Sequence, residues 1–177
     1  YEKPYYKDIP LPSGDLREPR SGAERANIIM VTKCPKCLSD IDKRDIVKQI
    51  APKAHQSVFF SSISYSDFLF SADSSKVLDE LEDFTLVTGI ANADPLVHFL
   101  NEKQLRFEHL NFKDHYDFSN EDIKILKNKA LILTTEKDFM RLKQYEILRD
   151  RLFYLPITVS IDNALEFNSQ IKSFVKH

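Results

Sequence analysis

The sequence predicts an α/β fold: a three-layer α/β/α sandwich built on a mostly parallel sheet. Short apolar runs rich in β-branched and aromatic residues alternate along the chain with segments whose apolar residues recur at helical spacing. This alternation is typical of parallel strands joined by crossover helices that cover the sheet. Hydrophobic residues at 42% and charged residues at 29% of the 177 are typical of a globular protein with one well-buried core.

The first 25 residues predict an irregular segment. Residues that break regular structure interrupt it at Pro4, Pro10, Pro12, Gly14 and Pro19. We therefore expect residues 1–25 to be a linker or the end of a truncated domain, and residues 26–177 to form the C-terminal α/β domain. Because the chain opens at Tyr1 without an initiator Met or an export signal, we also expect that the natural start has been removed.

Beyond this segment, short apolar runs are predicted to be strands and the segments between them helices. The predicted strands are Asn27–Thr32, Ser57–Ser62, Phe84–Thr88, Arg106–Asn111, Ala130–Leu133 and Leu152–Pro156. The predicted helices are Ser39–Ile50, Asp94–Glu102, Ser119–Leu126 and Asp162–Val175. No run of about 18 apolar residues occurs that could cross a bilayer.

The predicted helices carry recognisable starts. Asp94 is a candidate cap with Pro95 in the first turn, and Ser119 with Asp122 three residues later has the form of a capping box. The last helix presents apolar residues for packing on the sheet: Leu165, Phe167, Ile171, Phe174 and Val175.

Glycine is scarce, and this limits the ligands that the chain can hold. Only Gly14, Gly22 and Gly89 occur, far below the usual share of about 7%. Neither G-x-x-x-x-G-K-[ST] nor G-x-G-x-x-G, the spacings that cradle phosphates, is present. The chain therefore offers no candidate nucleotide-binding residues. A net charge of -2 argues against nucleic acid as a partner.

The Cys34-Pro35-Lys36-Cys37 motif lies between a predicted strand and a predicted helix. This is the layout of a thioredoxin-like redox pair, in which the helix N-terminus lowers the pKa of the first thiol. No second Cys pair or His pair lies at a useful spacing, so no metal site is predicted. Two ordinary small residues in a turn are the alternative, and so few cysteines favour a reducing, cytoplasmic compartment.

Residues 11–19, LPSGDLREP, contain a candidate substrate-binding pair, Arg17 and Glu18. A guanidinium binds phosphate oxygens in a fork, and a carboxylate accepts hydrogen bonds from sugar hydroxyls. Turn chemistry of Pro and Gly explains the same segment without any function.

Residues 112–118, FKDHYDF, follow a predicted strand, and the ends of strands in α/β sheets are where ligands usually bind. His115 and Asp114 are therefore a candidate catalytic pair, because an imidazole can accept the proton of a hydroxyl that attacks a phosphoryl group. A surface histidine in a polar loop is the alternative. The other histidines have no organised neighbours and are assigned no role: His55, His98, His109 and His177.

A second strand end carries the sequence TTEKD. Thr135 and Asp138 have the form of a capping box, which by itself explains both residues. Alternatively Thr135, Glu136, Lys137 and Asp138 line a cleft, with Lys137 facing an anion at the helix N-terminus.

Taken in order, these motifs resemble the carboxy-terminal part of the tetraacyldisaccharide 4'-kinase (lipid A 4'-kinase) family. The matching segments are LPSGDLREP, NIIMVTK, VFFSS, VTGIAN, FKDHYDF, LTTEKDFMRL and LFYLPI. They span nearly the whole chain. The sequence departs from the family pattern at Tyr116, where a second His is frequent.

The resemblance implies half of a two-domain P-loop kinase that works peripherally on the cytoplasmic face of the inner membrane of a Gram-negative bacterium. Such an enzyme transfers the γ-phosphoryl of ATP, with Mg²⁺, to the 4'-hydroxyl of an acylated glucosamine disaccharide 1-phosphate. The P-loop, the metal-binding carboxylates and a catalytic aspartate belong to the amino-terminal domain, which is the expected partner together with the membrane surface. ATP and Mg²⁺ would be bound mainly there, and the isolated chain is expected to be inactive.

The resemblance also implies roles for single residues. Arg17 and Glu18 match the LRE segment near the acceptor lipid. His115 matches a histidine that works at the 4'-hydroxyl, with Asp114 as its orienting neighbour, and residues 135–138 match a motif that is part structural and part cleft lining. Two other function classes stay open: a thiol-disulfide oxidoreductase using Cys34 and Cys37, and a non-catalytic interaction domain of shared ancestry.

Overall fold

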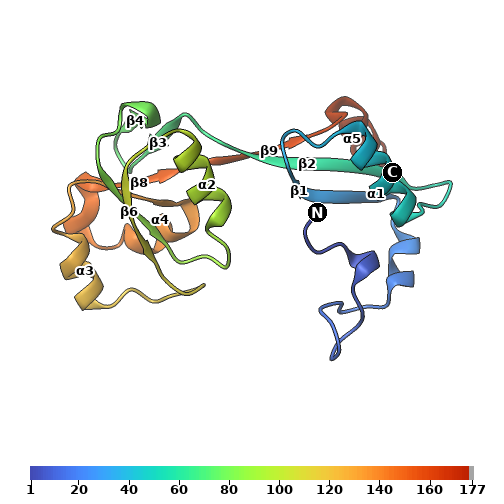
Figure 1. Ribbon diagram of the computed structural model, residues 1–177, viewed down its shortest axis with the longest axis horizontal. Helices are drawn as coiled ribbons and strands as arrows, with labels where there is room; N and C mark the ends of the chain where they lie inside the picture. Colours follow the sequence, from blue (N-terminus) through green and yellow to red (C-terminus); the bar gives the residue numbers. More distant parts are fainter. Residues whose placement is uncertain (176–177) are drawn as a thin grey trace. The chain divides into compact units, whose positions relative to one another are not determined.

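The computed structural model describes residues 1–175, which divide into two compact units (Figure 1). Unit 1 consists of residues 1–64 together with the chain from Thr158 onward, and unit 2 is Tyr65–Ile157. Unit 2 is thus inserted into the sequence of unit 1. These bounds differ from the predicted segments 1–25 and 26–177, and the predicted domain bounds stay a prediction.

The first 25 residues belong to unit 1 because they are tied to its sheet and the adjoining loop. The N-terminal ammonium of Tyr1 donates to the carbonyl of Thr32 at 2.8 Å. Gln56 Nε2 donates to the carbonyls of Ala23 and Ala26 at 2.8 and 2.7 Å. Two short 3-10 helices, Tyr5–Lys7 and Arg20–Arg25, are the regular structure of this segment.

Unit 1 contains a three-stranded sheet in the order β1-β2-β9. The strands are β1 (Ile28–Cys34), β2 (Ser57–Tyr65) and β9 (Ile157–Ile161), and β1 and β2 are parallel. The unit also contains α1 (Asp40–Ile50) and α5 (Ala164–Val175). Ser39 caps α1 by accepting a hydrogen bond from the Asp42 N–H.

Helix α5 contacts the sheet through fewer residues than the sequence predicts. The Phe167 ring packs edge-on against Phe59, with the ring centroids 5.3 Å apart. Leu165 and Val175 remain 89% and 81% exposed, so their predicted packing on the sheet is wrong. Leu165 lies two positions before Phe167, and with about 3.6 residues per turn it points to the opposite side of the helix.

Unit 2 contains a six-stranded sheet in the order β4-β3-β8-β7-β5-β6. The strands are β3 (Phe68–Phe70), β4 (Ser75–Val77), β5 (Phe84–Thr88), β6 (Phe107–Asn111), β7 (Ile132–Thr135) and β8 (Leu152–Leu155). Strands β5 to β8 pair in parallel, and β3 pairs with β4 and β8 in antiparallel fashion. The prediction of an α/β fold with a mostly parallel sheet is confirmed.

Helices cover both faces of this sheet. The helices are α2 (Asp94–Glu102), α3 (Asn120–Leu126) and α4 (Glu136–Leu142), with 3-10 turns at Leu78–Glu80 and Glu146–Arg151. Leu86 in β5 packs in one apolar cluster with Leu96 of α2, while its neighbour Val87 packs in a second cluster with Ile123 of α3 and Phe139 of α4. Successive strand residues point to opposite faces, so unit 2 has the predicted three layers.

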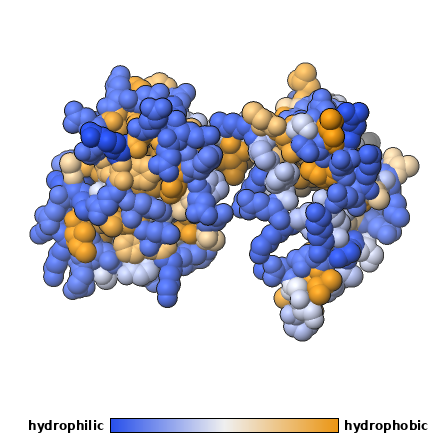
Figure 2. Space-filling view, in the orientation of Figure 1, coloured by the Kyte–Doolittle hydropathy of each residue, from blue (hydrophilic) through white to orange (hydrophobic). Residues whose placement is uncertain are grey.

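All six predicted strands are present, but they are divided between the two sheets. Strands β3, β4 and β9 were not predicted. The cap of α2 also differs from the prediction: Ala93 is the N-cap and Asp94 the first helical residue, whose N–H donates to Asn92 Oδ1 at 2.9 Å. Apolar side chains remain on the largely hydrophilic surface (Figure 2), among them Phe68 and Phe70 on either side of the buried Leu69.

Candidate functional site

The two motifs with candidate catalytic residues meet at one edge of the sheet of unit 2. Strand β5 pairs in parallel with β6 on one side and with β7 on the other, with Thr88 opposite Asn111 and Val87 opposite Thr134. The carboxyl ends of these three strands therefore lie side by side. The loop 112–118 leaves β6 there, and α4 begins there directly after β7.

An ion pair joins the motifs. Lys137 Nζ lies 2.8 Å from Asp114 Oδ1 and 3.4 Å from His115 Nε2. His115 Nε2 lies 3.8 Å from Asp114 Oδ2. The hydrogen bond from Lys137 is the main cause that lowers the pKa of Asp114 below its ordinary value. The structure thus brings His115, Asp114 and Lys137 together, with Asp114 held in its ionised form.

The backbone of His115 has an unusual conformation. Its φ is 58°, in the left-handed region that residues other than Gly seldom adopt. The His115 N–H donates both to Asp114 Oδ1 at 3.0 Å and to the carbonyl of Gly89 at 3.3 Å. The imidazole is 76% exposed. The loop therefore fixes the backbone of His115 and leaves the ring accessible to a ligand.

Aromatic packing anchors the rest of this loop. The rings of Phe112, Tyr116 and Phe118 contact one another with centroid separations of 4.8 to 5.6 Å. The Tyr116 hydroxyl donates to Asp122 Oδ2 at 3.1 Å, which ties the loop to α3. The Ser119–Asp122 capping box is confirmed, with both of its hydrogen bonds present.

Asp138 is fully buried, unlike its neighbours Glu136 and Lys137. Its Oδ2 accepts hydrogen bonds from the Gly89 N–H and from Thr135 Oγ1, each at 2.8 Å, and its Oδ1 accepts from Arg141 at 2.9 Å. Within unit 2 this carboxylate ties the end of β5 to α4. The predicted cleft-lining role of residues 135–138 stays a prediction. Thr135 caps α4, accepting the Asp138 N–H at 3.2 Å.

Gly89 occupies a place that no other residue fits without displacement. A Cβ atom there would lie 3.1 Å from Asp138 Oδ1, 3.4 Å from Arg141 Nη1 and 3.5 Å from the Lys113 carbonyl. The φ of Gly89 is not in the left-handed region, so backbone conformation does not require a glycine here. The glycine is needed because β5 and α4 approach each other closely at this point.

A model of the family described as tetraacyldisaccharide-1-P 4'-kinase matches residues 1–176. The chain belongs to the tetraacyldisaccharide 4'-kinase family.

Family members from several bacteria align along almost the entire chain. The tetraacyldisaccharide 4'-kinase of Flavobacterium johnsoniae is 38% identical over 182 residues, and that of Phocaeicola vulgatus is 35% identical over 195 residues. In both cases the alignment covers 99% of this chain and 53% of the relative. The chain therefore spans about half the length of the curated relatives it matches.

A solved structure has the same fold. LpxK from Aquifex aeolicus, crystallised in complex with ATP, superposes with a TM-score of 0.64 at 22% sequence identity. The match covers 94% of this chain and 48% of the Aquifex protein. At this level of identity the likeness establishes the fold.

The second pair of predicted family residues lies in the other unit. Arg17 and Glu18 belong to unit 1, and both are exposed. Glu18 Oε2 accepts a hydrogen bond from Arg25 Nη2 at 2.6 Å, so its charge is already paired within this unit. Neither unit by itself brings this pair together with His115, and its predicted role in substrate binding stays a prediction.

The environment of Cys34 is not that of a reactive thiol. Cys34 is buried and Cys37 is exposed. Burial is the main cause that raises the pKa of the Cys34 thiol above its ordinary value. A thioredoxin-like pair needs the opposite shift at its first cysteine, so this geometry gives the redox alternative no support.

The sequence did not predict a polar cluster that lies at the carboxyl ends of β5 and β6. His109 Nε2 lies 2.9 Å from Oγ1 of the buried Thr88, which also donates to Asn111 Oδ1 at 3.1 Å. Burial is the main cause that lowers the pKa of His109. The sequence signal that could have identified this cluster is the alternation of residues 107, 109 and 111 in a strand, which places them on one face.

His55 and His98 have surface contacts only, and His177 lies outside the described residues.

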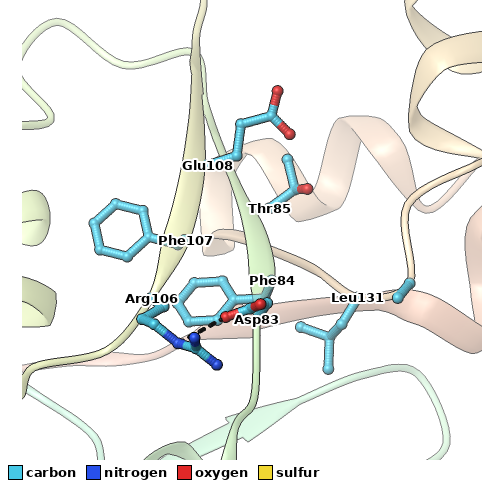
Figure 3. Close-up of a pocket in the computed structure, with 8 residues that line it drawn as sticks. Asp83, Phe84, Thr85, Arg106, Phe107, Glu108 and Leu131 are labelled. Atoms are coloured by element: carbon cyan, nitrogen blue, oxygen red, sulfur yellow. Dashed lines mark ion pairs between the residues drawn. The ribbon is translucent and has the colours of Figure 1, made fainter.

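A cavity of about 400 Å³ lies at the opposite edge of the sheet, at the amino ends of β5, β6 and β7 (Figure 3). Phe84, Phe107 and Leu131 line it together with the ion pair of Arg106 with Asp83, whose Nε and Oδ1 are 3.0 Å apart. The cavity contains none of the residues predicted for function. In open α/β sheets ligands usually bind at the carboxyl ends of the strands, where His115 lies.

Among residues 1–175, no group of three or more His, Cys, Asp or Glu side chains is arranged to hold a metal ion. None of the helices in this range combines the length and apolar character that crossing a bilayer requires.

Proposed function

We propose that this chain is the carboxy-terminal part of a tetraacyldisaccharide 4'-kinase. The intact enzyme would transfer the γ-phosphoryl of ATP to the 4'-hydroxyl of an acylated glucosamine disaccharide 1-phosphate in lipid A biosynthesis, at the cytoplasmic face of the inner membrane. The family match over residues 1–176 supports the assignment. The observation that carries the mechanism is the cluster of His115, Asp114 and Lys137 at the carboxyl edge of a parallel sheet.

His115 is the group proposed to handle the proton of the 4'-hydroxyl. Phosphoryl transfer to a sugar requires that this proton leaves as the oxygen attacks the γ-phosphorus, and an exposed imidazole can accept it. The ring is accessible while its backbone is held by Asp114 and Gly89. This combination suits a group that must meet a substrate in a fixed position.

Asp114 and Lys137 would prepare His115. Lys137 lowers the pKa of Asp114, and the ionised carboxylate, 3.8 Å from His115 Nε2, is the neighbour proposed to orient the imidazole. Arg17 and Glu18 are proposed to bind the phosphate and hydroxyl groups of the acceptor, in accordance with their chemistry.

ATP and Mg²⁺ are assigned to the remainder of the enzyme. The chain has neither glycine-rich phosphate-binding spacing, and residues 1–175 contain no cluster that fits a metal ion. Mg²⁺ would neutralise charge on the transferring phosphates when it is bound there. We accordingly propose that the partner of this chain is a P-loop domain of the same protein, and that the chain alone is inactive.

Replacing His115 tests the proposal. In the intact enzyme, His115→Ala should lower kcat by about 10²-fold, because a positioned proton acceptor is lost. Phosphoryl transfer from radiolabelled ATP to the disaccharide measures this. His98→Ala is the control, since His98 is exposed on α2 and pairs with Glu102. A His115→Ala enzyme with unchanged turnover would favour the non-catalytic interaction domain instead.

A further inference from the structure

Two helices of unit 2 begin with the same sequence pattern but use it differently. In Ser119-x-x-Asp122, the Asp122 carboxylate returns to the backbone N–H of its own N-cap at 2.8 Å. In Thr135-x-x-Asp138, the threonine caps the helix in the same way, but the Asp138 carboxylate bonds to the backbone of Gly89 at the end of β5. Capping of α4 therefore does not explain where the Asp138 carboxylate points.

The burial of Asp138 is costly and fully compensated. A carboxylate without water needs several donors to remain charged. Gly89, Thr135 and Arg141 supply them at 2.8, 2.8 and 2.9 Å. Together they fix the carboxylate, and the carboxylate in turn holds the N–H of the Thr88–Gly89 peptide group.

The other side of that glycine holds His115. The Gly89 carbonyl accepts the His115 N–H at 3.3 Å, so Asp138, Gly89 and His115 form a continuous path of hydrogen bonds. His115 needs such support because its φ of 58° is unfavourable for a residue with a side chain. The Cβ position of Gly89 also lies 3.5 Å from the Lys113 carbonyl, which places the start of the His115 loop against the same residue.

We infer that Asp138 is a positioning residue for His115, acting through the backbone of Gly89. The inference rests on the proposed function of His115 as the group that handles the proton. Loss of the carboxylate releases the N–H of Gly89. The Gly89 carbonyl that supports His115 can then move, and the imidazole shifts relative to the acceptor hydroxyl. A shift of about 1 Å in a reacting group is enough to slow an enzyme by up to about 10²-fold.

A double-mutant cycle separates positioning from simple stabilisation of α4. Asp138→Asn, His115→Ala and the double variant are made in the intact enzyme, and kcat and KM are measured for the disaccharide and ATP. Asp138→Asn should lower kcat about 10-fold or more with KM for ATP unchanged. In the His115→Ala background the same change should leave kcat unaltered, because the residue through which Asp138 acts is gone. An equal loss in both backgrounds, or none in either, overturns the inference.

A second measurement does not depend on activity. In NMR spectra of this chain, Asp138→Asn should shift the His115 imidazole signals and the Gly89 amide. Asp42→Asn is the matched control, because Asp42 occupies the same position after Ser39 at the start of α1 and is exposed. It should leave both signals in place. If Asp138→Asn does not fold, Gly89→Ala disturbs the same contact from the other end, since its methyl would meet Asp138 Oδ1.

The two measurements also keep the proposals apart. If the wild-type intact protein phosphorylates no disaccharide, the proposed function fails, while the NMR spectra still decide whether Asp138 positions His115. If His115 signals are unmoved in a folded Asp138→Asn or Gly89→Ala variant, the positioning role fails and the proposed function stands.

Discussion

At the scale of single residues, the ion pair between Lys137 and Asp114 controls the charge beside His115. The pair joins two motifs from different strand ends at a distance of 2.8 Å. Its effect is local because both side chains are partly exposed and solvent screens the interaction. The ion pair therefore affects the protonation state of Asp114 more than it affects the stability of the fold.

Lys137→Ala should raise the pKa of Asp114 towards its ordinary value, because the hydrogen bond from Lys137 is the main cause of the present lowering. The lowered pKa contributes stability that is present above the ordinary pKa of Asp and is lost as the pH falls through the lowered value. In the variant this pH-dependent contribution should largely disappear, because the pKa of Asp114 in the folded chain approaches its value in the unfolded chain. Carboxyl NMR titration of Asp114 measures the change, with Lys143→Ala as the control because Lys143 is exposed at the end of α4. An unchanged titration curve would contradict the assigned cause.

The sequence identified some site residues and not others, for physical reasons. His115 and Asp114 lie in a polar loop after a strand, and such loops are where parallel sheets present functional groups. The role of Asp138 could not be read in this way, because its partner Gly89 lies on another strand. His109 was overlooked because its partner Thr88 is brought beside it by strand pairing, which local pattern does not encode.

At the scale of elements, a capping box formed by Ser119 and Asp122 stabilises the start of α3. Ser119→Ala should destabilise the chain by about 1 kcal/mol, because the capping box of α3 loses the side-chain oxygen that accepts the Asp122 N–H. Urea denaturation followed by circular dichroism measures this. Ser169→Ala, at an exposed position within α5, should change stability by less than about 0.5 kcal/mol. Equal effects of the two changes would show that the cap contributes nothing.

Element types were predictable where the pattern is local, and pairing was not. The six predicted strands are apolar runs that the sequence reveals. Strands β3 and β4 are only three residues long, and β9 is almost entirely exposed, so these three strands have no long apolar run that would predict them. Periodicity also does not state which strands pair. The predicted single sheet is therefore two, with β1 and β2 in one and β5 to β8 in the other.

At the scale of the whole molecule, the two units have different chain connectivity. Unit 2 is one continuous segment, Tyr65–Ile157, whereas unit 1 is assembled from two segments that flank it in the sequence. Both apolar clusters of unit 2 consist of residues from within this segment, and so does its six-stranded sheet. The candidate catalytic cluster belongs to unit 2, and Arg17 and Glu18 belong to unit 1.

This connectivity predicts that unit 2 folds alone and unit 1 does not fold from its first segment. A polypeptide of residues 65–157 should unfold cooperatively on heating and keep the contact between Lys137 and Asp114, because a domain with its own core carries its stability with it. A polypeptide of residues 1–64 should lack a cooperative transition, since it is missing β9 and α5, whose Phe167 packs on Phe59. Near-ultraviolet circular dichroism and the Asp114 titration check both expectations. A non-cooperative transition for 65–157 would mean that the core of unit 2 depends on the rest of the chain.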